Sequence, residues 1–154
     1  MTPYLFVYGT LLQGSGSLMS VFLSKKGRLL GPGRLQGRLY MVDFFPGLVV
    51  DPAQTGWVKG EIYHLEHPET VLQVLDGYEG FHPEAPEKSL FVRQTLTVEG
   101  PDQALNCWVY LYQKTVAGLT PIDSGDFLQY ERDYLRGGSS SSEGVWDASS
   151  PEVD

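Results

Sequence analysis

Two acidic side chains fall close together near the end of a predicted helix, in the stretch Leu75-Asp76-Gly77-Tyr78-Glu79-Gly80. The C-terminal end of a helix carries partial negative charge, which disfavours a charged carboxylate in the last turn. Glu79 also lies between Tyr78 and Phe81, so we expect its carboxyl group to lose part of its hydration. Both effects raise a carboxyl pKa, and a raised pKa suits a general acid/base near neutral pH. The alternative, a solvated glutamate at a helix end, stays open on this signal alone.

The second stretch that could do chemistry runs from Tyr4 to Leu12. Its first residues are aromatic, apolar or β-branched, which predicts a buried strand that ends at Gly9-Thr10. A loop of main-chain N–H groups at such a strand end can hold an anion or a polarised carbonyl. The following Gly14-Ser15-Gly16 lacks the Gly-Lys-Ser/Thr of a phosphate-binding loop, so we do not expect a phosphate ligand.

Other catalytic chemistries find little support in the sequence. No serine lies in a Gly-x-Ser-x-Gly elbow, and Cys107 lies within a predicted strand beside a tryptophan, as a small core residue would. His64 and His67 straddle a strand end and a proline, and His82 lies in a predicted loop without a readable partner. We therefore expect neither a metal site nor a cofactor.

The composition limits the class of protein. The 154 residues are 42% hydrophobic and 12% aromatic, enough for one folded domain with a real core. The formal net charge of -8 argues against nucleic acid and against an anionic membrane surface as partners. We find no signal peptide and no apolar run long enough to span a bilayer, and a single cysteine suits a reducing compartment. The expectation is a cytoplasmic protein, either a monomer or a homodimer.

Strands outnumber helices in the predicted order of elements, and the two do not alternate regularly. Strands are expected at residues 4–8, 35–42, 47–50, 57–65, 90–99 and 105–113. A first helix is expected from Ser17 to Leu23, with an apolar face of Leu18, Val21 and Phe22. A second is expected from Pro68 to Gly80, with an apolar face of Val71, Leu72, Leu75 and Tyr78. A third is expected after Asp126. The pattern predicts an α+β fold, a small mixed β-barrel with a few short helices. Residues 1–136 would form this single domain, and residues 137–154 a flexible, Ser-rich acidic tail.

Between two of the predicted strands, Phe44-Phe45-Pro46-Gly47 is a turn with two large aromatic side chains. Aromatic side chains in a turn either pack inward or form the wall of a pocket.

In combination, the ordered motifs resemble the γ-glutamylcyclotransferase-like family, which includes the γ-glutamylamine cyclotransferases. The resemblance extends from Tyr4 to about Tyr134. Its motifs are Val7-Tyr8-Gly9-Thr10-Leu11, Phe45-Pro46-Gly47-Leu48-Val49, Val58-Lys59-Gly60-Glu61-Ile62-Tyr63, Leu75-Asp76-Gly77-Tyr78-Glu79-Gly80, Val92-Arg93, Cys107-Trp108-Val109-Tyr110 and Ser124-Gly125-Asp126.

The resemblance implies a mixed barrel of five or six strands and a two-part site. Glu79 would be the catalytic acid/base, and the loop of Gly9, Thr10, Leu11 and Leu12 would bind a γ-glutamyl group or 5-oxoproline. We expect Tyr8, Phe45 and Tyr112 to wall the pocket, with a half-buried strand position as the equal alternative for Tyr112. The family usually has a tyrosine two residues before the Val92-Arg93 arginine, whereas this chain has Phe91. The missing hydroxyl bears on substrate choice.

The implied reaction converts a γ-glutamyl amide or dipeptide to 5-oxoproline and a free amine or amino acid. The substrate supplies its own nucleophile, so no serine, cysteine or metal is required. A non-catalytic small-ligand binding module on the same scaffold is the alternative.

Overall fold

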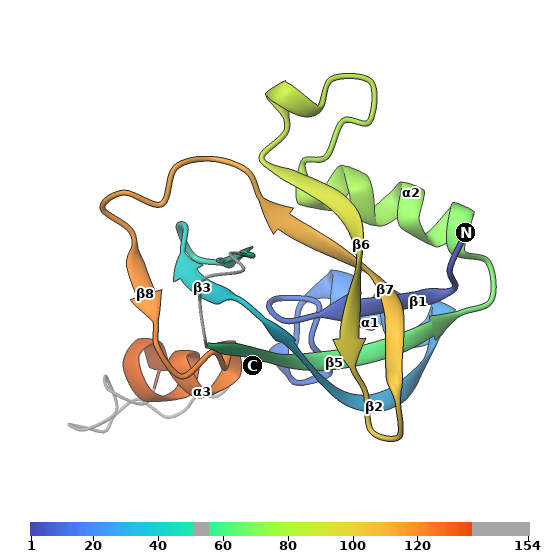
Figure 1. Cartoon of the computed structure of the whole chain (residues 1–154), viewed down its shortest axis with the longest axis horizontal. Helices are drawn as coiled ribbons and strands as arrows, with labels where there is room; N and C mark the ends of the chain where they lie inside the picture. Colours follow the sequence, from blue (N-terminus) through green and yellow to red (C-terminus); the bar gives the residue numbers. More distant parts are fainter. Residues whose placement is uncertain (51–55, 137–154) are drawn as a thin grey trace.

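The computed structural model describes residues 1–50 and 56–136 of the chain, in which strands predominate (Figure 1). The predicted tail, residues 137–154, lies outside the described residues. The strands are β1 (Tyr4–Val7), β2 (Gly27–Gln36), β3 (Arg38–Met41), β4 (Pro46–Val49), β5 (Trp57–Leu65), β6 (Phe91–Glu99), β7 (Ala104–Tyr112) and β8 (Thr120–Ile122). The helices are α1 (Leu18–Lys26), α2 (Pro68–Glu79) and α3 (Phe127–Tyr130), with short helical turns η1 (Gln13–Ser15), η2 (Pro86–Lys88) and η3 (Glu131–Arg136).

Five strands close into a barrel in the order β1-β5-β2-β6-β7, and β7 returns to β1. The β1–β7 pair is parallel and the other neighbours are antiparallel, so the barrel is mixed. A separate three-stranded sheet has the order β4-β3-β8. In Figure 1, β8 and α3 lie on the left of the barrel, and α2 lies above it. These observations confirm the predicted fold class.

The barrel is tightly closed around β1 because small residues let the neighbouring backbones approach. A Cβ atom at Gly60 of β5 would collide with the carbonyl oxygen of Val7, so any other residue would push the two strands apart. Phe6, Ile62 and Val109 are almost completely buried in this core. The core therefore fixes the direction in which β1 leaves the barrel and enters the loop that follows.

The helix α2 has the predicted bounds for the predicted reasons. Pro68 stands at its start, and Gly80 ends it in the left-handed conformation with φ 68°. Of its expected apolar face, Val71, Leu72 and Leu75 are buried, but Tyr78 is 45% exposed. None of the helices in the described part of the chain is long and apolar enough to cross a membrane.

The expected apolar face of α1 is wrong for Leu18 and Val21, whereas Phe22 is partly buried and packs against the core. Leu18 and Val21 are exposed, whereas Ser20 and Leu23 are buried. The hydroxyl of Ser20 donates to the main-chain carbonyl of Ser17, which lets this polar side chain be buried. Periodicity over so short a helix did not determine which side would meet the barrel.

The expected strand from Leu35 to Val42 is also wrong, because two strands of different sheets occupy this stretch. The break falls at Gly37, where a Cβ atom would lie 2.9 Å from the carbonyl oxygen of Val49. The chain leaves the barrel at this point, and β3 pairs with β4 and β8 instead. The short strand β8 was not predicted.

Candidate active site

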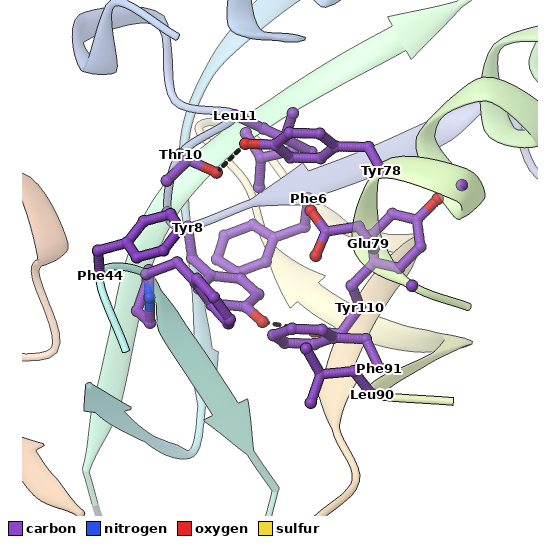
Figure 2. Close-up of a pocket in the computed structure, with 16 residues that line it drawn as sticks. Phe6, Tyr8, Thr10, Leu11, Phe44, Tyr78, Glu79, Leu90, Phe91 and Tyr110 are labelled. Atoms are coloured by element: carbon purple, nitrogen blue, oxygen red, sulfur yellow. Dashed lines mark hydrogen bonds between the residues drawn. The ribbon is translucent and has the colours of Figure 1, made fainter. Parts of the chain in front are cut away.

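A cavity of about 300 Å³ opens between the end of β1, the end of α2, the β3–β4 turn and the start of β6 (Figure 2). Most of its wall is apolar or aromatic. Its lining residues are Phe6, Val7, Tyr8, Gly9, Thr10, Leu11, Phe44, Phe45, Pro46, Gly77, Tyr78, Glu79, Gly80, Leu90, Phe91 and Tyr110.

Glu79 is the one lining residue whose side chain is a carboxylic acid, and Figure 2 shows its carboxyl group directed into the cavity. The residue is half-buried at the last position of α2. The N–H group of Phe81 donates to the carbonyl of Asp76 at 2.9 Å, so the chain turns sharply and Glu79 is held at the cavity wall. Burial of the carboxyl group, followed by the negative charge of Asp76, raises the pKa of Glu79 from 4.5 to about 7. Both protonation states are therefore populated near neutral pH.

Asp76 has a different role from Glu79, although both lie in the last turn of α2. Its carboxylate accepts two hydrogen bonds from Arg93, at 2.8 and 3.0 Å, and one from the Tyr110 hydroxyl at 2.7 Å. The guanidinium carbon of Arg93 lies 4.4 Å from the centre of the Trp108 ring. This buried network ties the end of α2 to β6 and β7.

The sequence contained a signal for this network that we did not use. Asp76 lies one turn after Leu72 and next to Leu75, on the face of α2 that packs inward. An acidic residue on such a face needs a charged partner, because an isolated buried carboxylate is costly. That partner is Arg93, which the sequence marks only through the Val92-Arg93 motif.

Tyr8 forms part of the cavity wall and its hydroxyl is fully engaged. It donates to the main-chain carbonyl of Tyr110 at 2.6 Å and accepts from the N–H group of Leu48 at 3.3 Å. Burial, and next the charge of Glu79, raises the pKa of the Tyr8 phenol well above its ordinary value. Tyr8 therefore shapes the pocket and does not exchange protons near neutral pH.

Several hydrogen bonds hold the loop after β1 in one shape. The carbonyl oxygen of Thr10 accepts from the hydroxyls of Ser15 and Ser17, at 2.6 and 2.5 Å. The Thr10 and Tyr78 hydroxyls are 2.8 Å apart and join the loop to α2, as Figure 2 shows. Within the described part of the chain, no acceptor is found for the main-chain N–H groups of Thr10 and Leu11. These two N–H groups are the candidates for binding a ligand oxygen.

Most of the predicted site residues meet in this one cavity, namely Tyr8, Gly9, Thr10, Leu11, Phe45 and Glu79. Leu12 and Tyr112 do not line it. The N–H group of Leu12 donates to the carbonyl of Gly9 at 3.0 Å, so it cannot also bind a ligand. The ring of Tyr112 packs behind Phe91, with 5.7 Å between the ring centres. Tyr112 supports the cavity wall from outside, which agrees with the alternative of a half-buried strand position.

Within the described part of the chain, neither a reactive cysteine nor a metal site accompanies this cavity. Cys107 is completely buried, and burial raises the pKa of its thiol to about 12. Among residues 1–50 and 56–136, no three His, Cys, Asp or Glu side chains are close enough together to hold a metal ion.

In this small closed barrel, one carboxyl group faces a main-chain loop across a pocket, an arrangement that suits acid/base chemistry on a small molecule. Residues 5–129 match the family model described as Gamma-glutamyl cyclotransferase, AIG2-like. The chain belongs to this family.

Relatives and solved structures agree with this assignment. The gamma-glutamylcyclotransferase family protein YtfP of Escherichia coli K12 is 31% identical over 132 residues, which cover 83% of this chain and 98% of YtfP. The crystal structure of an AIG2-like protein from Mus musculus superposes with a TM-score of 0.61 and 26% identity, over 80% of this chain and 88% of that one. YkqA from Bacillus subtilis superposes with a TM-score of 0.67 over 88% of this chain, although this chain spans only 43% of YkqA. Because the two are 24% identical, this likeness shows the fold alone.

Proposed function

We propose that this protein converts a γ-glutamyl amide or dipeptide to 5-oxoproline and a free amine or amino acid. The observation that carries the proposal is the Glu79 carboxyl group, with its pKa raised to about 7, in the same cavity as the loop residues Thr10 and Leu11. Membership of the family supports the same class of reaction. The substrate is a small molecule, and the reaction needs no group that the chain lacks.

In the proposed reaction, the α-amine of the substrate attacks the γ-carbonyl carbon of the same molecule. A C–N bond closes the five-membered lactam, and the original amide C–N bond breaks. The cavity wall favours the step by holding the γ-glutamyl chain in a curled conformation, which brings the two reacting atoms together. The N–H groups of Thr10 and Leu11 stabilise the oxyanion of the tetrahedral intermediate.

Glu79 moves the protons in this reaction. The α-ammonium group loses two protons in becoming the lactam N–H, and the leaving nitrogen gains one before the bond breaks and a second on release as an ammonium ion. The Glu79 carboxylate accepts a proton from the attacking nitrogen and returns it to the leaving nitrogen. A carboxyl group with a pKa near 7 does both efficiently, because neither protonation state is strongly disfavoured.

The products formed in water enriched in oxygen-18 test this proposal. Purified protein is incubated with a panel of γ-glutamyl amides and dipeptides, and the products are analysed by mass spectrometry. Intramolecular attack predicts unlabelled 5-oxoproline in amounts equal to the released amine. Labelled glutamate would identify a hydrolase instead. Binding of a γ-glutamyl compound without any product would favour the non-catalytic binding module.

A further inference from the structure

Aromatic side chains continue from the rim of the cavity into its wall. Phe44 is 77% exposed at the rim, and its ring centre lies 5.4 Å from that of Phe45. The ring of Phe45 lies 6.0 Å from that of Phe91, which is almost completely buried. Leu90 completes this side of the cavity. We call Phe44, Phe45, Leu90 and Phe91 the aromatic wall.

Leu90 and Phe91 of the aromatic wall lie across the cavity from the loop after β1, whereas Phe44 lies at its rim. In Figure 2, Thr10 and Leu11 lie at the top of the cavity, Leu90 and Phe91 lie at the bottom, and Phe44 lies at the left. The loop would hold the γ-glutamyl part of a substrate beside Glu79. The remaining part, which leaves as the amine, would then extend along the aromatic wall toward the exposed ring of Phe44.

The charges of the cavity also restrict the leaving group. No Lys, Arg or His stands among the 16 residues that line it. The nearby cation Arg93 is bound at two points by Asp76 and is not a lining residue. Every γ-glutamyl compound carries one carboxylate on its α-carbon, so the restriction concerns a second one. A second carboxylate, on the leaving group, would lie against the aromatic wall, lose hydration without gaining a cationic partner, and add to the negative charge of Glu79.

On the basis of the proposed function, we infer that the preferred substrates are γ-glutamyl amides of amines that carry an aromatic or similarly flat apolar group and no carboxylate. The aromatic wall is the binding subsite for that group. Exposed rings such as that of Phe44 gain from being covered by another apolar surface, and ring–ring contact adds directional attraction.

Three matched substrates separate the effects of the ring and of the carboxylate. They are γ-glutamyl-phenethylamide, γ-glutamyl-ethylamide, which lacks the ring, and γ-glutamyl-phenylalanine, which adds a carboxylate to the phenethylamide. We expect kcat/KM for 5-oxoproline release to be at least about ten-fold higher for the phenethylamide than for either of the others. Values within about two-fold of one another would overturn the inference while leaving the proposed function intact. No 5-oxoproline from any of the three, when another γ-glutamyl compound of the panel does release it, would overturn the inference alone. No 5-oxoproline from any compound of the panel would overturn the proposed function and the inference with it.

The variant Phe44→Ala tests whether the aromatic wall causes the preference. Phe44 is largely exposed, so the substitution is not expected to affect folding. We expect the ratio of kcat/KM between phenethylamide and ethylamide to fall at least about three-fold. The control Leu18→Ala removes an 87% exposed apolar side chain of α1 that does not line the cavity, and it should leave the ratio unchanged. An unchanged ratio in Phe44→Ala would overturn the assignment of this subsite.

Discussion

Asp76 and Arg93 form a two-point ion pair just behind the pocket that contains Glu79. The two contacts measure 2.8 and 3.0 Å, and the side chains are only 10% and 14% exposed. Arg93 thus pairs with the carboxylate that Asp76 places within one helical turn of Glu79. The ion pair has two consequences that can be tested separately, one for the pKa of Glu79 and one for the stability of the fold.

Asp76→Asn is expected to lower the pKa of Glu79. The charge of Asp76 is the second cause of the raised pKa, after burial, so its removal makes ionisation of Glu79 easier. Because the carboxylate form of Glu79 starts the proposed reaction, the rise of kcat/KM with pH moves to lower pH. A pH–rate profile of the folded variant measures this shift. A midpoint that stays in place or moves upward would contradict the assignment.

Arg93→Met is expected to destabilise the protein by roughly 3 kcal/mol, because it leaves Asp76 as a buried charge without its cation. Urea unfolding monitored by tryptophan fluorescence gives the free energy of unfolding. Arg34→Met is the matched control: Arg34 pairs with Glu99 at 2.9 Å, but these side chains are 51% and 53% exposed. Its loss should cost about 1 kcal/mol or less. Equal losses in the two variants would show that the buried pair does not contribute as described.

Glu79→Gln is expected to stabilise the fold at pH 8 and to have little effect at pH 4. The pKa of Glu79 is higher in the folded protein, about 7, than its ordinary value of 4.5, so the folded state binds the proton more tightly. As the pH rises from 4.5 to about 7, Glu79 therefore lowers the free energy of unfolding by on the order of 3 kcal/mol, and the loss persists at higher pH. Unfolding free energies of both proteins at about pH 4, 6 and 8 test this. A difference that is independent of pH would mean that the carboxyl pKa is not raised.

Ser17→Ala is expected to loosen the loop after β1. The Ser17 side chain accepts from the N–H group of Ser20 at the start of α1, and its hydroxyl donates to the carbonyl of Thr10. Loss of such a helix cap costs about 1 kcal/mol, and the freed loop should lower kcat/KM several-fold. In the control Ser24→Ala, the lost hydroxyl donates only within α1, to Val21, so activity should be retained. Normal kcat/KM in Ser17→Ala would mean that activity does not depend on this hydrogen bond to the loop, and it would contradict the prediction.

The sequence predicts best the elements whose ends carry their own local signals. The strand β5 has its predicted bounds, and α2 begins at Pro68 and stops before Gly80 because proline and left-handed glycine act within a few residues. By contrast, the break between β2 and β3 at Gly37 depends on the carbonyl oxygen of Val49. That oxygen lies near Gly37 only because β3 pairs with β4. The exposure of Leu18 depends on how α1 meets the barrel.

The candidate site shows the same division. The pairing of Glu79 with the loop after β1 was implied by the family resemblance, which rests on motifs that each lie within a few residues; the residue pattern alone left a solvated glutamate open. The bond between Tyr8 and the Tyr110 carbonyl, and that between Asp76 and Arg93, join residues far apart in sequence. Leu12 was expected to bind substrate, but its N–H group closes a turn with Gly9, a detail that residue types do not reveal.

The most direct test of the central claim is the rate of 5-oxoproline release by Glu79→Gln on the best substrate of the panel. The amide of the variant would keep the size and hydrogen-bonding capacity of the side chain but could not carry the proton. The control Glu69→Gln changes an exposed glutamate in the first turn of the same helix. We predict that kcat falls by on the order of 10³-fold or more in Glu79→Gln, with the fold intact, and stays within about two-fold in the control. Near-normal turnover in Glu79→Gln would contradict the account.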